Sequence, residues 1–355
     1  MEKAPVPYPP VLHSLASAST ITWLIHQKFE LSIPLYRQEK EWEALGLRLS
    51  RATMSNWLLV VYRDWLVHIV HRLKLELLKQ RYLHIDETHV QVLKEPGRKN
   101  TSDSYMWVYC SIRDAVNPIR YFEYQPGRSG KYPEAFLREY EGYIHTDAYS
   151  GYNAVSGVKR CLCYTHLRRA FVDALPKDIH NSEASKPAEA ILRLNQLFNI
   201  ESELEAFPPD QKKKERLIRE KPLLEAFWSW AEKSAIGELP KSKLSKAFHY
   251  ALNNREGFWN YLEDGNCSIS NSLAENCIRP FVIGRKNWLF SGSPKGAEAS
   301  AGIYTLVETA KANGLAPMKY IKYILSDMPG SAFLEHPEYL DDYLPWNPLV
   351  KEFCR

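Results

Sequence analysis

Hydrophobic positions recur with a helical period through the first eighty residues. The apolar spacing predicts helices in "SASTITWLIHQKFE" and in the stretch from "PLYRQEKEWEAL" to "HRLKLELL". The helix "YRQEKEWEAL" should end near Gly46, and Ser50 is placed to cap the next helix, "RATMSNWLLVV". Helix, glycine-containing turn and capped helix is the order of a helix-turn-helix. A plain helical hairpin has the same pattern, so both interpretations stay open.

The period changes to that of strands at residue 81. Three runs rich in β-branched and aromatic residues, separated by turn-forming stretches, predict an antiparallel meander: "YLHIDETHVQVL", "SYMWVYCSI" and "IRYFEYQ". The order then alternates between helix ("KYPEAFLREYE"), strand ("GYIHTDAYSGY"), a further candidate strand ("VKRCLCY") and a helix with Thr165 as its cap ("THLRRAFVDAL"). A meander followed by alternation predicts a mixed α/β fold in the ribonuclease-H-like layout.

The second half of the chain is expected to be mainly helical. Residues from about 176 to 262 carry a helical period without a strand signal, which predicts an all-helical insertion. Its "KKKER" run fits a solvated helix face better than a nucleic-acid patch. In "SNSLAENCIRP", Asn271 could cap a short helix that leaves Glu275 and Arg279 one turn apart. A further helix is expected from Gly296 to Asn313, with Gly314 just past its end.

These patterns divide the chain into five predicted regions. They are an N-terminal helical, helix-turn-helix-like region at 1–79, the first part of a ribonuclease-H-like core at 80–175, the helical insertion at 176–262, the second part of the core at 263–315, and a C-terminal tail at 316–355.

Composition and charge limit the classes of function. A hydrophobic content of 45% and a charged content of 25% in 355 residues are ordinary for a soluble globular protein. The net charge of +4 permits a nucleic-acid partner without demonstrating one. No apolar run approaches the roughly 18 residues of a membrane span. Six cysteines without framework spacing, and no signal-peptide pattern, favour a reducing cytoplasm.

Two adjacent carboxylates in the middle of the strand pattern "RYLHIDETHVQVL" require an explanation. Successive residues of a strand point to opposite faces, so Asp86 shares a face with His84 and Thr88, whereas Glu87 lies on the other. Asp86 and Glu87 therefore cannot serve one site. Because an unpaired buried carboxylate is costly, Asp86 is expected to have a compensating partner.

Two other acids could join Asp86 in one site. Asp147 ends an apolar strand just before a glycine-containing turn, where catalytic groups of α/β sheets often lie. Glu275 lies in the predicted short helix. Two aspartates and a glutamate from separate segments can hold two Mg²⁺ or Mn²⁺ ions for phosphoryl transfer. For each acid taken alone, a capping or salt-bridged role is the alternative.

Several blocks of the chain resemble insertion-sequence-66-type transposases. The stretch "NSLAENCIRPFVIGRKNWLFSGSPKGAEASAGIYTLVETAKANGLAP" resembles the C-terminal signature of that family, and "HIDETHVQVL", "HTDAYSGYN" and "CYTHLRRAF" resemble other blocks in the same order. The resemblance covers nearly the whole chain. It implies a DDE transposase on a ribonuclease-H-like fold, with Asp86, Asp147 and Glu275 as its three acids and two Mg²⁺ or Mn²⁺ ions as cofactors. The expected activity is metal-dependent cleavage and strand transfer of insertion-sequence DNA.

The resemblance also implies partners. They are the element ends and target DNA, a homo-oligomer assembled on that DNA, and companion proteins encoded by the element, with no membrane. Basic residues interleaved with an aromatic suit a phosphate backbone and an unpaired base. Such a cluster follows Glu275 and consists of Arg279, Arg285, Lys286 and Trp288, although Trp288 could instead pack among surface charges. Arg51 and Asn56 of the second N-terminal helix are further candidates for DNA contact.

The chain departs from the family pattern in two places. It begins close to the helical block, without the family's usual zinc-binding and coiled-coil-like region. Ser270 and Asn276 stand where the family often has an acid and an arginine. A truncated, non-autonomous transposase that binds DNA without moving an element is therefore one alternative. A ribonuclease-H-like nuclease or resolvase, which cuts without joining strands, is another.

Weaker candidates complete the set. Glu298 and Glu308 are alternative third acids. Structural zinc needs four ligands, and "CLCYTH" offers three, which are Cys161, Cys163 and His166. The stretch "GRSGKY" has too few residues between its glycines for a phosphate-binding loop, and Tyr132 replaces the Ser or Thr that such a loop needs. We therefore exclude a P-loop.

Overall fold

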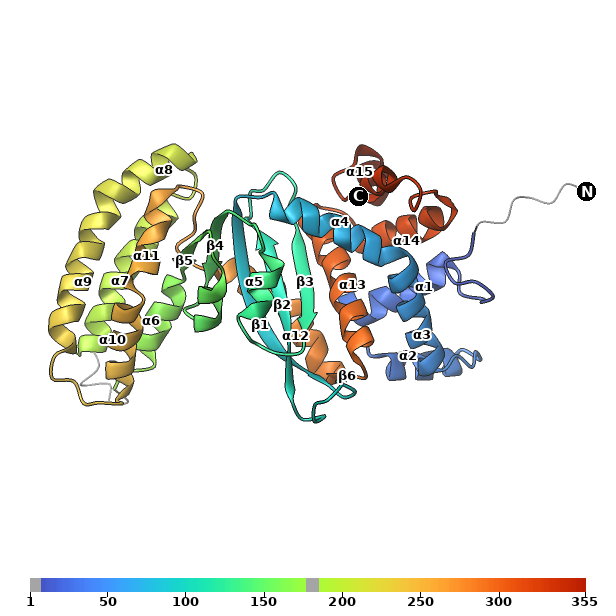
Figure 1. Cartoon of the computed structure of the whole chain (residues 1–355), viewed down its shortest axis with the longest axis horizontal. Coiled ribbons are helices and arrows are strands. Elements are labelled where there is room, and N and C mark those ends of the chain that lie inside the picture. Colours follow the sequence, from blue (N-terminus) through green and yellow to red (C-terminus); the bar gives the residue numbers. More distant parts are fainter. Residues whose placement is uncertain (1–7, 177–184) are drawn as a thin grey trace, which may run out of the picture. The chain divides into compact units, whose positions relative to one another are not determined.

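The computed structural model describes residues 8–176 and 185–355 (Figure 1). By its internal contacts the chain divides into two units. The first unit comprises Met1–Gln80, Asp86–Tyr132 and Ala274–Arg355, and the second comprises Arg81–Ile85 and Pro133–Leu273. Among the described residues, no helix combines the length and the hydropathy that crossing a bilayer requires.

The N-terminal part of the first unit is helical, as the sequence predicts. Its helices are α1 (Ala18–Ile25), α2 (Leu35–Ala44), α3 (Arg51–Val61) and α4 (Val67–Leu78). Ser50 caps α3, because its hydroxyl oxygen accepts a hydrogen bond from the Thr53 N–H at 3.1 Å. Gly46 lies between α2 and α3 with a φ of +86°, a left-handed conformation that glycine adopts without strain. The predicted helix, glycine turn and capped helix are confirmed.

One mixed sheet runs through the chain in the order β3-β2-β1-β4-β5, with β6 paired to β1. Its strands in the first unit are the greater part of β1 (Tyr82–Val92), β2 (Asp103–Ser111), β3 (Arg120–Gln125) and β6 (Phe290–Ser291). β2 and β3 are antiparallel, with Trp107 opposite Glu123, whereas β6 is parallel to β1. The predicted mixed α/β architecture and its first three strands are confirmed.

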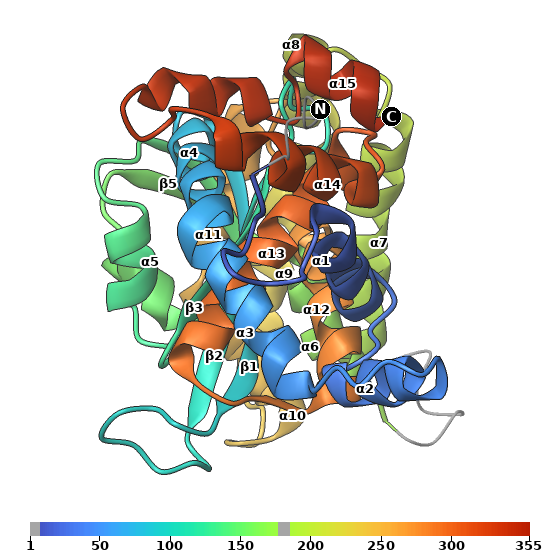
Figure 2. The ribbon, with the colours of Figure 1, turned by 90° about the vertical axis from the view of Figure 1, so that its right-hand side faces the viewer.

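Helix α13 (Pro294–Ala312) covers the edge of this sheet at β3. It lies between β3 and the N-terminal helices, with α14 (Pro317–Asp327) beside it (Figures 1 and 2). The Thr305 Oγ1 accepts a hydrogen bond from the Phe122 N–H at 2.8 Å, and one turn later the Thr309 Oγ1 accepts from the Arg120 N–H at 3.1 Å. Both threonines are fully buried. The helix therefore satisfies N–H groups that an edge strand would otherwise leave unpaired.

The close approach of α13 to its neighbours depends on small residues. A Cβ atom added at Gly302 would lie 2.1 Å from the Tyr62 ring, far inside van der Waals contact. Its middle stretch, Ala299–Val307, is buried at every position, as expected for a helical segment enclosed on all sides. The predicted helix from Gly296 to Asn313 is thus confirmed, and Gly314 follows it with a φ of +69°.

In the second unit, β4 (Gly142–Thr146) pairs in parallel with both the start of β1 and β5 (Val158–Leu162). The remaining elements are helical: α5 (Lys131–Phe136), α6 (Tyr164–Val172), α7 (Lys186–Glu203), α8 (Pro209–Glu215), α9 (Lys221–Ala235), α10 (Lys243–Asn253) and α11 (Arg255–Trp259). The predicted cap of α6 at Thr165 is wrong. The pairing of β5 with β4 ends at Leu162, so Cys163 precedes the helix and Thr165 lies inside its first turn.

The helices of the second unit enclose a buried ion pair. The Arg216 guanidinium is inaccessible to solvent and donates to both Glu201 carboxylate oxygens, at 2.6 and 2.8 Å. The "KKKER" run is a solvated face only in part, because its last residue is this buried arginine while Lys213 and Lys214 are exposed. A neighbouring carboxyl, Glu220, accepts a hydrogen bond from the Tyr261 hydroxyl at 2.6 Å. Burial, followed by the nearby Glu201 carboxylate, raises the pKa of Glu220 to about 8.

We expect the Thr305→Val substitution to lower the free energy of unfolding by about 1–3 kcal/mol, because it leaves the buried Phe122 N–H without its acceptor. Thr305→Ser retains the hydroxyl and is the matched control. Urea denaturation followed by circular dichroism measures both. A Thr305→Val protein within about 0.5 kcal/mol of the wild type would show that the edge of β3 does not depend on this bond.

The Glu220 carboxyl makes stability depend on pH. Its pKa is near 4.5 when unfolded and about 8 when folded, so the folded state holds the extra proton between these values. The contribution to stability is lost as the pH rises through 8. Between pH 7 and pH 9 we expect the free energy of unfolding to fall by about 1 kcal/mol in the wild type and by less in Glu220→Gln, whose side chain cannot ionise. Equal slopes in urea denaturation would contradict this assignment.

Candidate active site

The two mid-strand carboxylates of β1 lie in different surroundings. The Glu87 side chain is only 2% exposed and is paired with the Arg128 guanidinium, whose Nε lies 2.6 Å from its Oε1. Asp86 is half-buried, and its Oδ1 accepts a hydrogen bond from the Glu87 N–H at 2.9 Å. Glu87 is therefore compensated as a structural ion pair, which leaves Asp86 as the site candidate on this strand.

Asp147 follows the last residue of β4, at the strand end where the sequence places it. Its Oδ1 accepts a hydrogen bond from the Tyr149 N–H at 3.0 Å, which turns the chain away from the strand. The Arg160 guanidinium holds this turn from β5, because its Nη2 donates to the backbone carbonyls of Asp147 and Tyr149 at 2.6 and 2.8 Å. These hydrogen bonds therefore fix the turn that carries the Asp147 carboxylate.

Two stacked histidines lie on neighbouring parallel strands, each two residues before one of these aspartates. His84 of β1 is the register partner of His145 of β4, and their rings are stacked with centroids 4.2 Å apart. Asp86 follows His84 by two residues, and Asp147 follows His145 by two residues in a parallel strand. The sequence analysis missed this relation. The repeated His-x-Asp pattern in "HIDET" and "HTDAY" is the signal that could have found it.

Asn271 immediately precedes a helix of the predicted core, and its side chain binds β1. It is 1% exposed, and its Nδ2 donates to the Ile85 carbonyl at 2.8 Å while its Oδ1 lies 3.0 Å from His84 Nδ1. Its backbone N–H donates to Cys163 Sγ at 3.1 Å. Asn271 directly precedes the helix, where a cap is expected, and the helix is long rather than short.

That helix, α12 (Ser272–Trp288), carries Glu275 in its first turn. A carboxylate in the first turn is favoured by the helix dipole. Glu275 is half-buried, and Arg279 lies exposed one turn later, as the sequence predicts. The alternative acids lie on α13, where Glu308 pairs with Lys311 at 2.8 Å and burial raises the pKa of Glu298.

The predicted DNA-contacting residues divide into exposed and internally engaged side chains. Arg279 and Lys286 are exposed on α12, and Arg51 and Asn56 are exposed on α3. Arg285 instead donates to the Thr88 hydroxyl at 2.9 Å and to the His89 carbonyl, and burial lowers its pKa.

Trp288 packs edge-on against Phe281 with ring centroids 5.3 Å apart. This contact supports the alternative in which Trp288 packs within the protein instead of contacting DNA.

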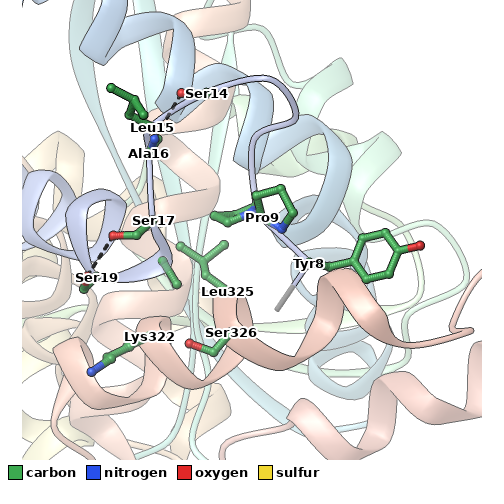
Figure 3. A pocket seen from close by; sticks show the side chains of 12 residues that line it. Tyr8, Pro9, Ser14, Leu15, Ala16, Ser17, Ser19, Lys322, Leu325 and Ser326 are labelled. Atoms are coloured by element: carbon green, nitrogen blue, oxygen red, sulfur yellow. Dashed lines mark hydrogen bonds between the residues drawn. The ribbon is translucent and has the colours of Figure 1, made fainter. Parts of the chain in front are cut away.

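A separate cavity of about 470 Å³ lies in the first unit (Figure 3). It is formed by the chain before α1, including Tyr8 and Leu15, and by Lys322 and Leu325 of α14. Its described lining contains no carboxylate, so this cavity is not the site of the predicted acids.

Comparison with known proteins identifies a family. A family model described as "Transposase IS66 family" matches residues 13–299. Two relatives from Sinorhizobium fredii (strain NBRC 101917 / NGR234) align over most of this chain. The uncharacterized protein y4hP is 25% identical over 98% of the chain, and the uncharacterized protein y4qI is 28% identical over 94%. The chain spans 65% and 63% of the length of these two proteins.

Because Asn271 satisfies two buried groups of β1, we expect Asn271→Ala to lower the free energy of unfolding by about 2–4 kcal/mol. Asn266→Ala, a half-buried asparagine of the same loop, is the matched control and should cost less. Thermal and urea denaturation measure both. An equal or smaller loss for Asn271→Ala would show that the bridge between β1 and α12 adds little.

Proposed function

Because the chain belongs to the IS66 transposase family, we propose that it catalyses metal-dependent cleavage and strand transfer of insertion-sequence DNA, with Asp86, Asp147 and Glu275 as the acids of its active site. The observation that carries this proposal is the pairing of His84 with His145 on parallel strands. Each histidine precedes one aspartate by two residues, and side chains two residues apart along an extended strand share one face of the sheet.

The strand order supports a ribonuclease-H-like fold for this catalytic core. The order β3-β2-β1-β4-β5 places β2 and β3 on one side of β1 and the parallel strands β4 and β5 on the other. Asp86 lies within β1, and Asp147 directly follows its neighbour β4. The third acid comes from α12, after the helices of the predicted insertion.

The donor set fits hard divalent cations. Asp86, Asp147 and Glu275 offer carboxylate oxygens, and all three side chains are half-buried rather than sealed from solvent. Such oxygens are the ligands that Mg²⁺ and Mn²⁺ prefer. When bound, two such ions would activate the attacking hydroxyl and stabilise the leaving oxygen of a phosphodiester.

The residues of the chain supply position and charge. The Tyr149 N–H and the Arg160 guanidinium hold the turn of Asp147, and the Glu87 N–H orients Asp86. Positive side chains would bind the phosphates of the DNA, a contribution that weakens with added salt. In this proposal Arg279 and Lys286 act near Glu275, whereas Arg51 and Asn56 act from α3 as part of a helix-turn-helix.

The reaction is proposed in two steps. Water first attacks a phosphodiester at the element end and releases a 3′-hydroxyl. This hydroxyl then attacks a phosphodiester of the target DNA, which joins the element end to a target 5′-phosphate and releases a target 3′-hydroxyl. Assembly of a homo-oligomer on the DNA and the help of companion proteins encoded by the element belong to the same proposal.

The test is cleavage and strand joining on DNA that carries the terminal repeats of the element, with Mg²⁺ or Mn²⁺. We expect Asp86→Asn, Asp147→Asn and Glu275→Gln each to lower both rates by at least about 100-fold, because each removes a charged oxygen donor of the metal site. Salt-dependent DNA binding should persist in all three. Glu298→Gln and Glu308→Gln are matched controls that should retain activity.

Other outcomes distinguish the alternatives. Loss of activity in Glu298→Gln or Glu308→Gln, with Glu275→Gln active, would move the third acid to α13. Cutting without joining would favour a ribonuclease-H-like nuclease or resolvase. DNA binding by a wild-type protein that neither cuts nor joins would favour a non-autonomous transposase.

A further inference from the structure

Three metal-ligating side chains converge in the interior of the second unit. They are His145 of β4, Cys161 of β5 and Cys267 in the segment that leads to α12. Their ligand atoms all lie within 4.8 Å of one another. Each residue is 1% exposed. The set differs from the cysteines and histidine of "CLCYTH", because it shares only Cys161 with them.

The imidazole of His145 is oriented as a ligand. Its Nδ1 lies 3.1 Å from the Leu83 carbonyl oxygen, which can only accept, so Nδ1 carries the proton and Nε2 presents a lone pair. Metal-binding histidines commonly donate their second ring N–H to a backbone carbonyl in this way. The Ser268 N–H donates to Nε2 at 2.9 Å, and a bound metal would have to displace this bond.

Ionisation of the two buried thiols is unfavourable unless a cation binds the resulting thiolates. The adjacent Cys161 thiol and burial both raise the pKa of Cys267, so without metal this side chain remains a neutral thiol. A buried thiolate without a compensating charge is unfavourable. A bound cation would neutralise thiolates at this position, with release of their protons.

We propose that His145, Cys161 and Cys267 bind one soft metal ion, either Zn²⁺ or Cu⁺. Thiolate and imidazole ligands select these ions over Mg²⁺ and Mn²⁺. Zn²⁺ balances the charge of two thiolates but usually takes a fourth ligand, whereas Cu⁺ is satisfied by three. The Zn²⁺ and Cu⁺ arms of the experiment below distinguish them. The proposal is independent of the carboxylate site.

The position of the cluster gives the ion a structural role. It would link the end of β4, two residues before Asp147, with β5 and with Cys267, which precedes Asn271 by four residues. The ion would thus fasten together three segments of the second unit. A structural metal binds the folded state in preference to the unfolded chain, so it raises the melting temperature.

The experiment uses the full chain, purified under reducing conditions without chelator, and begins with elemental analysis. The metal-free protein is then titrated anaerobically with Zn²⁺, Cu⁺ and, as a spectroscopic probe, Co²⁺. We expect one equivalent of Zn²⁺ or Cu⁺ per chain, thiolate-to-Co²⁺ charge-transfer absorption, and a higher melting temperature that Mg²⁺ does not reproduce. Cys161→Ser and Cys267→Ser should each weaken binding more than about 100-fold, since loss of an outer partner alone costs about 10- to 100-fold.

Two matched variants test the position of the ion. Cys163→Ser removes another buried thiol two residues from Cys161, and Asp147→Asn alters the carboxylate site. Both should retain the soft metal. The proposal is overturned if the wild type binds no soft metal, if Cys161→Ser and Cys267→Ser bind as tightly as the wild type, or if Cys163→Ser loses the ion equally.

If a variant fails to fold, the wild-type protein alone still tests whether thiolates bind the ion. A bound Co²⁺ ion without charge-transfer absorption would overturn the proposal, because it would have no thiolate ligand.

Discussion

The hydrogen bonds of the buried Asn271 side chain fix how the segment before α12 lies against β1 in the second unit. One side chain satisfies the Ile85 carbonyl and His84 Nδ1, while its own backbone N–H reaches Cys163. A buried amide with fixed partners permits one relative placement of its segments, because any slip leaves polar groups unpaired. Asp86 directly follows Ile85 in β1, and Glu275 lies four residues after Asn271, so both acids lie close in sequence to this fixed point.

Two charged side chains in the interior each have a partner that neutralises them. Glu87 has Arg128, and Arg216 has Glu201, each within 2.6 Å. Backbone groups obey the same rule at β3, where α13 supplies threonine hydroxyls to an edge strand. In our proposal the carboxylate of Asp86 on β1 binds divalent cations, which neutralise its charge in mid-strand.

Local patterns predicted local structure well. Ser50 caps α3 and Gly314 ends α13 because capping depends on residues within one turn. The sequence analysis failed where the partner is distant. Thr165 was a plausible cap, yet strand pairing decided where α6 begins, and nothing near Arg216 in the sequence indicates the Glu201 carboxylate that permits its burial. The repeated His-x-Asp pattern is visible in the sequence. Only the parallel register shows that the two histidines are neighbours on adjacent strands.

The central claim is that Asp86, Asp147 and Glu275 form one shared metal site. The most direct test is to let an iron ion bound at that site cleave the nearby backbone. Fe²⁺ would replace Mg²⁺, and ascorbate with peroxide would generate hydroxyl radicals that cut nearby backbone. The account predicts cuts around Asp86, Asp147 and Glu275 together, all suppressed by excess Mg²⁺ and all weakened by Asp147→Asn alone. Cuts at only one of these segments, or cuts near Asp86 and Glu275 that persist unchanged in Asp147→Asn, would contradict a shared site.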